Sequence, residues 1–267
     1  MKAIYIGIYV VVIYSLVIAS LYWFQEKLIF QGSSLPQDYQ FDISVPFEEV
    51  YLKAEDAAVL HGVLLKCANP KGAILYFHGN RGNISRWGNL AAYFSRFDYD
   101  VLVMDYRGYG KSKGKRTEQI LHADATLAYQ YLETKYEPEN IIIYGRSLGT
   151  GIATRLASTV ESKSLILETP YHDFGAMMFK RMGVLPSRKL FRYQFRSNSY
   201  IGRVSCPVFI FHGTEDNIVP IEYGRKLAGS VNRGLLSLTV IEGGGHNNLG
   251  TFDAYNNKMK QIFSNQN

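Results

Sequence analysis

The chain has 267 residues, a length that favours a single large α/β domain over two small ones. Hydrophobic residues make up 47% and charged residues 19%, a globular composition that excludes a disordered, collagen-like or coiled-coil protein. The net charge of +6 fits a membrane surface or an acidic ligand, but it is too small to indicate nucleic-acid binding. The two cysteines, Cys67 and Cys206, exclude a disulfide scaffold and a cysteine-rich zinc site, although in an exported domain the two could form one pair.

The amino terminus carries an uncharged apolar run over residues 3–24. A helix of that length reaches about 33 Å, enough to cross a hydrocarbon core of roughly 30 Å. We therefore predict a single-pass membrane anchor over residues 1–27; a cleaved signal peptide and a buried core helix are the alternatives. Positive charges beside a membrane span favour the cytoplasmic side. Lys2 and the α-amine before the span, against Lys27 after it, slightly favour an amino terminus inside the cell and a domain outside it.

A linker is predicted over residues 28–44, and the main domain over residues 45–267. Residues 47–53 and 59–67 alternate around a polar break, which indicates a β-hairpin, and the short apolar runs that follow indicate strands buried on both faces, as in a parallel sheet. The predicted strands are 47–53, 59–67, 73–78, 101–106, 141–145, 164–168, 208–213 and 236–242. The predicted helices are 85–97, 117–135, one that opens at Leu148, 221–231 and 249–263. This alternation predicts βαβ units and a parallel sheet covered by helices.

Residues 170–203 break the alternation and form a predicted cap insert. The segment carries seven basic residues and a single acid, Asp173, together with several methionines and phenylalanines. Such a composition fits a lid that touches an anionic membrane surface or an acyl chain. An ordinary helical insert with snorkelling cations is the alternative.

The strongest chemical signal is the pentapeptide Gly145-Arg146-Ser147-Leu148-Gly149, which follows an apolar strand and opens a helix. A serine on such a turn needs strained backbone angles, and the chain approaches so closely that both flanking positions must be small. The pentapeptide occurs by chance elsewhere, but the strand–turn–helix context is present here. We predict Ser147 as a nucleophile.

A serine hydroxyl needs a base, and the base needs a carboxylate to orient it. Of the six histidines, we predict His246, on a glycine-rich loop after the last strand, as the base. Asp216, after the penultimate strand, is the predicted acid, with Glu215 and Asp173 as alternatives.

Four other histidines have predicted structural roles. His61 and His122 lie inside a strand and a helix, whereas His78 and His212 end strands and anchor loops.

An oxyanion needs two fixed backbone donors. We predict the amide of Leu148, directly after the nucleophile, and the amide of Asn80, in the loop after the strand 73–78. The residues expected to line the substrate site are Arg81, His172, Met177 and Met178.

Other motifs fail on inspection. Gly110-Lys111-Ser112 resembles the end of a phosphate-binding loop, but Asp105 stands where that loop requires its first glycine. No histidines or acids fall at zinc-like spacing, so we expect no metal and no cofactor.

These motifs together resemble those of the α/β-hydrolase family, and more narrowly its membrane-anchored members and its bacterial lysophospholipase-like, serine-aminopeptidase-type branch. The matching segments are 77–80, 105–112, 145–149, 212–216 and 245–246, in family order. The resemblance implies an α/β-hydrolase fold, with a mainly parallel eight-stranded sheet, flanking helices and a cap after the sixth strand. It leaves the substrate open, since members cleave lysophospholipids, glycerides, protein thioesters, simple esters and peptides.

We therefore predict a membrane-anchored serine hydrolase that cleaves carboxylic esters or thioesters of an acyl lipid or lipidated substrate through an acyl-enzyme. A peptidase or amidase on the same triad is one alternative. A non-catalytic binding protein with a hydrolase fold is the other, although such proteins usually lose a member of the triad.

Overall fold

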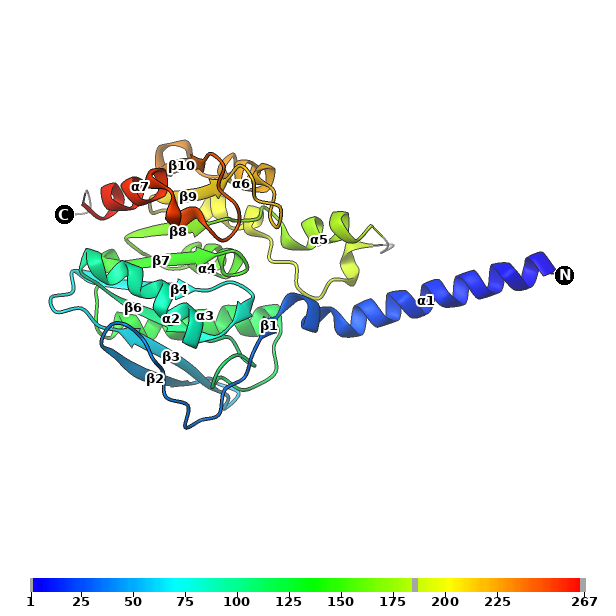
Figure 1. The fold of residues 1–267 in the computed structure, drawn as a ribbon, viewed down its shortest axis with the longest axis horizontal. Coiled ribbons are helices and arrows are strands. Elements are labelled where there is room, and N and C mark those ends of the chain that lie inside the picture. Colours follow the sequence, from blue (N-terminus) through cyan, green and yellow to red (C-terminus); the bar gives the residue numbers. More distant parts are fainter. Residues whose placement is uncertain (1, 184–186, 265–267) are drawn as a thin grey trace.

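An eight-stranded sheet forms the centre of the computed structural model, which describes residues 2–183 and 187–264 (Figure 1). The spatial order is β10-β9-β8-β7-β4-β6-β3-β2. The strands are β2 (Phe47–Lys53), β3 (Val59–Leu65), β4 (Gly72–Phe77), β6 (Tyr99–Met104), β7 (Ile141–Arg146), β8 (Ser164–Glu168), β9 (Val208–Gly213) and β10 (Leu236–Ile241). In this spatial order, every pair of neighbours from β10 to β6 is parallel. The two antiparallel pairs are β6 with β3 and β3 with β2. The predicted α/β fold and its strands are confirmed, with ends shifted by one or two residues.

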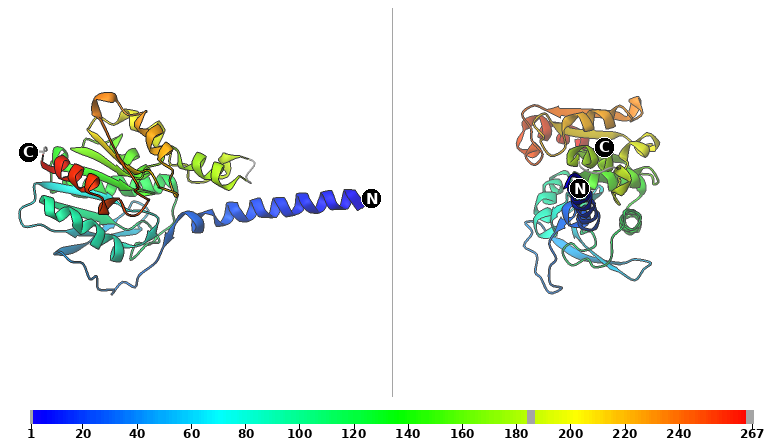
Figure 2. Two further views of the ribbon diagram at one scale, coloured as in Figure 1. Left: turned by 45° about the horizontal axis from the view of Figure 1, so that its top comes forward. Right: turned by 90° about the vertical axis from the view of Figure 1, so that its right-hand side faces the viewer.

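Helices cover both faces of the sheet (Figures 1 and 2). Apolar side chains of α3, α4 and α6 join the core on one face, and those of α2 and α7 join the core on the other. The helices are α2 (Ile84–Ala91), α3 (Glu118–Glu133), α4 (Gly149–Ala157), α6 (Ile221–Ala228) and α7 (Asp253–Ser264). Strands β4 and β6 are buried at every residue, which explains their continuous apolar sequences.

Two predicted helices are interrupted. The helix predicted over 85–97 ends as α-helix at Ala91 and continues as the 3₁₀ helix η1 (Ala92–Phe97), which stops where Asp98 adopts a φ of 62°. The helix predicted over 249–263 starts as η7 (Leu249–Thr251), and the extended backbone of Phe252 separates it from α7. The other 3₁₀ helices are η2 (Pro138–Asn140), η3 (Arg188–Leu190), η4 (Ser197–Ser199), η5 (Ile201–Arg203) and η6 (Arg233–Leu235).

Helix α1 (Lys2–Ile29) projects away from the domain (Figures 1 and 2). Its most apolar window has a mean hydropathy of 2.4 and none of that window is buried in the protein, so α1 is a candidate membrane anchor and not a core helix. The predicted linker, residues 28–44, lies against the domain. Ile29 and Phe30 are buried, and β1 (Gln31–Gly32) pairs with β5 (Arg81–Gly82).

The cap leaves the domain on the same side as α1 (Figures 1 and 2). It contains α5 (Phe174–Met182) and the 3₁₀ helices η3 to η5; residues 184–186 of the predicted insert lie outside the described residues. Asp173 caps α5 by accepting a hydrogen bond from the amide of Ala176. The end of the cap is attached to α3, because the Glu118 carboxylate accepts the amides of Gln194 and Phe195 at 2.6 and 3.1 Å.

The two cysteines are both free. Cys206 is buried and its sulfur accepts a hydrogen bond from Ser162, while Cys67 is only partly buried. The pairing considered for an exported domain is therefore not formed in this structure.

Candidate active site

Ser147 stands on a tight turn between β7 and α4. Its φ of 51° lies in the left-handed region, which is strained for a serine. A Cβ at Gly145 would lie 2.7 Å from the Cβ of Ala153, and one at Gly149 would lie 2.1 Å from the carbonyl oxygen of Phe77. Only glycine fits at either flank, as expected from the sequence.

His246 lies between Ser147 and Asp216. Its Nδ1 is 2.7 Å from Asp216 Oδ2, and its Nε2 is 2.8 Å from Ser147 Oγ. A carboxylate only accepts, so Nδ1–H donates to Asp216 and Nε2 of the neutral ring accepts from the Ser147 hydroxyl. The three residues come from the ends of β7, β9 and β10, and they form the relay through which a serine can lose its proton.

Asp216 is buried and strongly hydrogen-bonded. Burial by itself raises the pKa of this carboxyl, but the interactions with His212 and His246 and the amide of Val219 outweigh it and hold the pKa well below its ordinary value. The amides of Ile218 and Val219 donate to Oδ1 at 2.9 and 2.8 Å. Asp216 is therefore charged and fixed in orientation.

The two alternative acids are occupied elsewhere. Glu215 is exposed to solvent, and Asp173 caps α5 and pairs with Arg188 at 3.3 Å. Of the three acids considered, Asp216 is the one that contacts His246.

A close backbone contact holds the acid loop and the histidine loop together. The amide of Glu215 donates to the carbonyl of Gly244 at 2.8 Å, and a Cβ at Gly213 would lie 2.0 Å from that same oxygen. The glycines around His246 thus allow its loop to pack against the loop that carries Asp216.

The predicted oxyanion donors lie beside Ser147. Within the described residues, neither the amide of Asn80 nor that of Leu148 donates a hydrogen bond, and both residues line one pocket with Ser147. Tyr109 donates to the Asn80 carbonyl at 2.7 Å, and Tyr171 donates to the Leu148 carbonyl at 2.9 Å. These two tyrosines fix the backbone directly after each predicted donor residue.

The pocket at Ser147 has a volume of about 240 Å³ and a largely apolar lining. Of the predicted substrate contacts, Arg81, Met177 and Met178 line it. His172 does not; its carbonyl accepts the amide of Asn198 at the base of the cap.

Sequence reasoning missed several lining residues. Leu28, Ile29 and Gln31 come from the end of α1 and the segment after it; the others are Tyr171, Phe174, Arg181, Ile218 and Val219. Residues 28–31 directly follow the predicted anchor, and nothing in their sequence distinguished a pocket wall from a linker.

The four histidines with predicted structural roles lie away from the relay or support it. His61 is buried and pairs with Glu49, and His122 lies in α3. His78 donates from Nδ1 to the Gly79 carbonyl at 2.7 Å, next to Asn80. His212 donates from Nε2 to the Val219 carbonyl at 2.7 Å and lies 3.4 Å from Asp216, so it holds the acid loop in place.

No group of three or more His, Cys, Asp or Glu side chains in residues 2–183 and 187–264 is arranged to hold a metal ion.

Proteins of known family are similar to this chain in sequence. Human alpha/beta hydrolase domain-containing protein 17B is 33% identical over 210 residues, which cover 76% of this chain and 70% of that protein. The chain belongs to the α/β-hydrolase family. The mouse 17C protein is 34% identical over 212 residues, 76% of this hydrolase and 63% of the relative. A family model described as serine aminopeptidase, S33, matches residues 68–199.

Solved structures agree with this α/β-hydrolase fold. An esterase of Pyrococcus furiosus superposes with a TM-score of 0.69 at 21% identity, covering 88% of this hydrolase and 98% of the esterase. An esterase of Exiguobacterium antarcticum gives 0.63 at 17% identity, covering 81% and 100%.

Proposed function

We propose that this hydrolase is a membrane-anchored serine esterase or thioesterase that cleaves acyl lipids or lipidated substrates through an acyl-enzyme. The observation that carries the proposal is the hydrogen-bonded chain from Ser147 Oγ through His246 to Asp216, at 2.8 and 2.7 Å, which opens into an apolar pocket. The esterases among the structural neighbours are consistent with it.

The mechanism follows from the chemistry of these groups. Ser147 Oγ attacks the acyl carbonyl carbon while His246 Nε2 takes its proton, and the amides of Asn80 and Leu148 stabilise the oxyanion. His246 then protonates the alcohol or thiol, whose bond to the acyl carbon breaks as the tetrahedral intermediate collapses to the acyl-enzyme. A water molecule, deprotonated by His246, attacks the acyl carbon, and His246 returns the proton to Ser147 Oγ as the fatty acid is released. Asp216 orients His246 and stabilises its cationic form.

An acyl group fits the lining of the pocket. Phe174, Met177 and Met178 of the cap supply apolar surface, and methionine adapts well to flexible chains. The pocket adjoins α1, so a substrate carried in a membrane would reach Ser147 over a short distance. Basic side chains of the cap are suited to an anionic membrane surface.

A peptidase on the same relay is the second candidate, because the matching family model is described as serine aminopeptidase. An aminopeptidase needs an acidic group to hold the substrate amine. In the described part of the chain, this pocket is lined by Arg81 and Arg181 but by no carboxylate, which favours the ester or thioester.

The proposed nucleophile is tested by labelling the full chain, in detergent, with a fluorophosphonate probe. We expect the wild-type chain to be labelled and Ser147→Ala to remain unlabelled, because the probe reacts only with an activated serine. Ser85→Ala, which alters a serine at the start of α2, serves as the control and should label like the wild type. A folded wild-type chain that is not labelled, with or without anionic vesicles, would support a non-catalytic role.

The acyl preference is tested with thioesters from acetyl to palmitoyl. We expect long chains to be preferred and anionic vesicles to raise the rate. A flat profile that vesicles leave unchanged would contradict a lipid substrate.

The orientation of the anchor is also part of the proposal. Lys2 and the α-amine, against Lys27, favour the amino terminus inside and the hydrolase domain outside. Protease added to intact cells should then digest the domain.

A further inference from the structure

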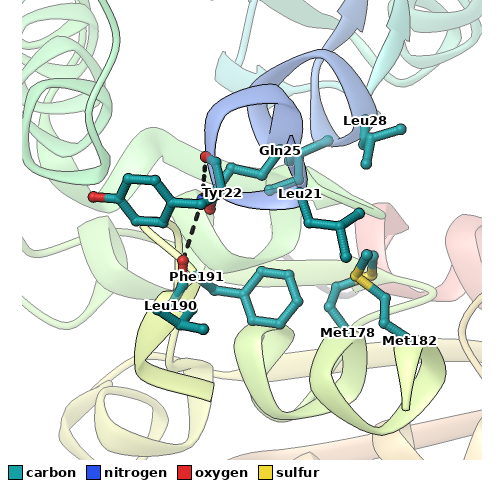
Figure 3. Close-up of a pocket in the computed structure, with 9 residues that line it drawn as sticks. Leu21, Tyr22, Gln25, Leu28, Met178, Met182, Leu190 and Phe191 are labelled. Atoms are coloured by element: carbon teal, nitrogen blue, oxygen red, sulfur yellow. Dashed lines mark hydrogen bonds between the residues drawn. The ribbon is translucent and has the colours of Figure 1, made fainter. Parts of the chain in front are cut away.

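A second, tight pocket adjoins the one at Ser147, in the seam between α1 and the cap (Figure 3). It contains about 10 Å³ of free space. Its lining residues are Leu21, Tyr22, Gln25, Leu28 and Ile29 of α1, and Met178, Met182, Leu190 and Phe191 of the cap. Leu21 points toward Met178 and Met182 in Figure 3, and Phe191 lies beside them.

The two pockets are adjacent. Leu28, Ile29 and Met178 line both, so these shared apolar side chains stand between Ser147 and the seam, and a path from one to the other passes them. Leu21 and Leu28 are seven residues apart on one face of α1, a distance of about 10 Å along the helix axis. The path therefore runs parallel to α1 toward the uncharged part of that helix.

The base of α1 is fixed to the cap by hydrogen bonds. The amide of Arg192 donates to Gln25 Oε1 at 2.7 Å, and Gln25 Nε2 donates to the Leu190 carbonyl at 3.2 Å. Glu26 pairs with Arg192 at 3.0 Å and accepts the Tyr193 hydroxyl at 3.0 Å. The polar groups of Gln25 are thus satisfied, and the seam offers mainly apolar side chains to an occupant.

We propose that the hydrocarbon tail of a long acyl substrate runs from Ser147 past Leu28 and Met178 into the seam between α1 and α5, so that the membrane anchor forms one wall of the acyl-chain site. This inference rests on the proposed function. A peptide or headgroup would bring polar groups into a seam that offers them few partners, whereas a hydrocarbon chain has none to satisfy. The unbranched side chains of Met178 and Met182 can shift to widen the tight seam.

Chain-length selectivity tests the path. Leu21→Trp and Met182→Trp each fill the seam, so we expect the ratio of kcat/KM for a hexadecanoyl thioester over a butyryl thioester to fall about tenfold or more in the full chain. Leu16→Trp places the same ring on α1 at an exposed position outside the lining, and it should keep the wild-type ratio. An unchanged ratio in both seam variants would overturn the proposal.

A second measurement does not depend on turnover. A fatty acid with a diazirine near its methyl end is photo-crosslinked to the full-length Ser147→Ala variant in detergent. We expect crosslinks on α5, with a strong reduction when Leu21→Trp is added. Crosslinks that avoid α5, or that Leu21→Trp leaves unchanged, would overturn the acyl path. Absence of hydrolysis at every chain length in the wild type, with these α5 crosslinks intact, would instead overturn the proposed esterase activity.

Discussion

Ser147, His246 and Asp216 lie far apart in the sequence, and each is held by its own local structure. Ser147 is fixed by a strained turn with φ of 51°, and Asp216 by the amides of Ile218 and Val219. The hydrogen bonds that join the three span 99 and 30 residues of sequence. Local turn chemistry therefore prepares each side chain, and the parallel sheet brings them together at its carboxyl edge.

Asp216→Asn tests the orientation of His246. An amide at this position can donate to Nδ1 and favour the wrong tautomer, so we expect kcat to fall by roughly 10⁴-fold while the fold is retained. Steady-state kinetics measures the loss of kcat, and circular dichroism checks that the fold is retained. Glu215→Gln, at the exposed neighbour, should stay near wild type; an equal loss in both variants would contradict the assignment.

Asp216 also makes stability depend on pH. Its pKa is lowered in the folded state, because the interactions with His212 and His246 outweigh burial, which by itself raises it. The stabilisation is therefore present above the unfolded pKa of about 3.9 and is lost as the pH falls toward the folded pKa. Urea unfolding between pH 7 and pH 3 should show a shallower loss of stability for Asp216→Asn than for the wild type. An equal loss of stability with falling pH in the variant and the wild type would contradict the contribution of Asp216.

Arg146 forms a buried ion pair beneath the serine. Its Nε lies 3.0 Å from Glu168 Oε1, and the two side chains are 11% and 3% exposed. Glu168 also accepts the hydroxyls of Tyr144 and Tyr255, and Arg146 Nη2 reaches the Asn247 carbonyl beside His246 at 3.3 Å. The pair thus connects the serine turn with the histidine loop.

Removing one partner of this pair should be costly. Arg146→Met leaves the Glu168 carboxylate buried and unpaired, so we expect a loss of about 3–5 kcal/mol in the free energy of unfolding. Adding Glu168→Gln removes that charge, and the double variant should be more stable than Arg146→Met alone. A urea-unfolding double-mutant cycle measures this; strictly additive losses would contradict the coupling.

At the scale of elements, the cap is attached to the sheet through the start of α3. Glu118 has a lowered pKa: burial opposes the shift, but the His122 ring, 3.6 Å away, and the hydrogen bonds from the amides of Gln194 and Phe195 outweigh it. The charged form of Glu118 therefore stabilises the contact above the unfolded pKa of about 4.3, and this contribution is lost as the pH falls below it.

Glu118→Gln should loosen the cap without unfolding the sheet. The neutral amide is a weaker acceptor for the two backbone amides, so we expect faster hydrogen exchange at Gln194 and Phe195 at neutral pH. Glu133→Gln, at the exposed far end of α3, is the matched control and should exchange like the wild type. Unchanged exchange in Glu118→Gln would show that other contacts hold the cap.

At the scale of the whole molecule, the end of α1 is packed against the hydrolase domain. Gln25, Ile29 and Phe30 are buried against the domain, and β1 pairs with β5 next to Asn80. The side chain of Asn80 donates to the Ile29 carbonyl at 3.1 Å. The end of α1 thus supports the loop that carries a predicted oxyanion donor.

Truncation should reveal this dependence. A chain that begins at Ser33 loses Ile29, Phe30 and β1, so we expect Tm to fall by several degrees or more, because each buried side chain contributes about 1.5–3 kcal/mol. A chain that begins at Gln25 keeps these buried residues and loses mostly exposed apolar side chains, with Leu21 and Tyr22 of the seam, so its Tm should stay closer to that of the full-length chain. Equal Tm values for the two shortened chains would contradict the role of residues 25–32.

The sequence by itself determined the features that depend on local patterns. The apolar run predicted α1, alternation and short apolar runs predicted the eight strands, and the glycines around Ser147 predicted its turn, because each of these depends on neighbours in the chain. Only the tertiary structure decided which acid meets His246, that His172 lies outside the pocket, and that Leu28 and Ile29 wall it. Those outcomes depend on contacts between segments that lie far apart in the sequence. The packing of helices, loops and sheet creates these contacts, and no local sequence pattern contains them.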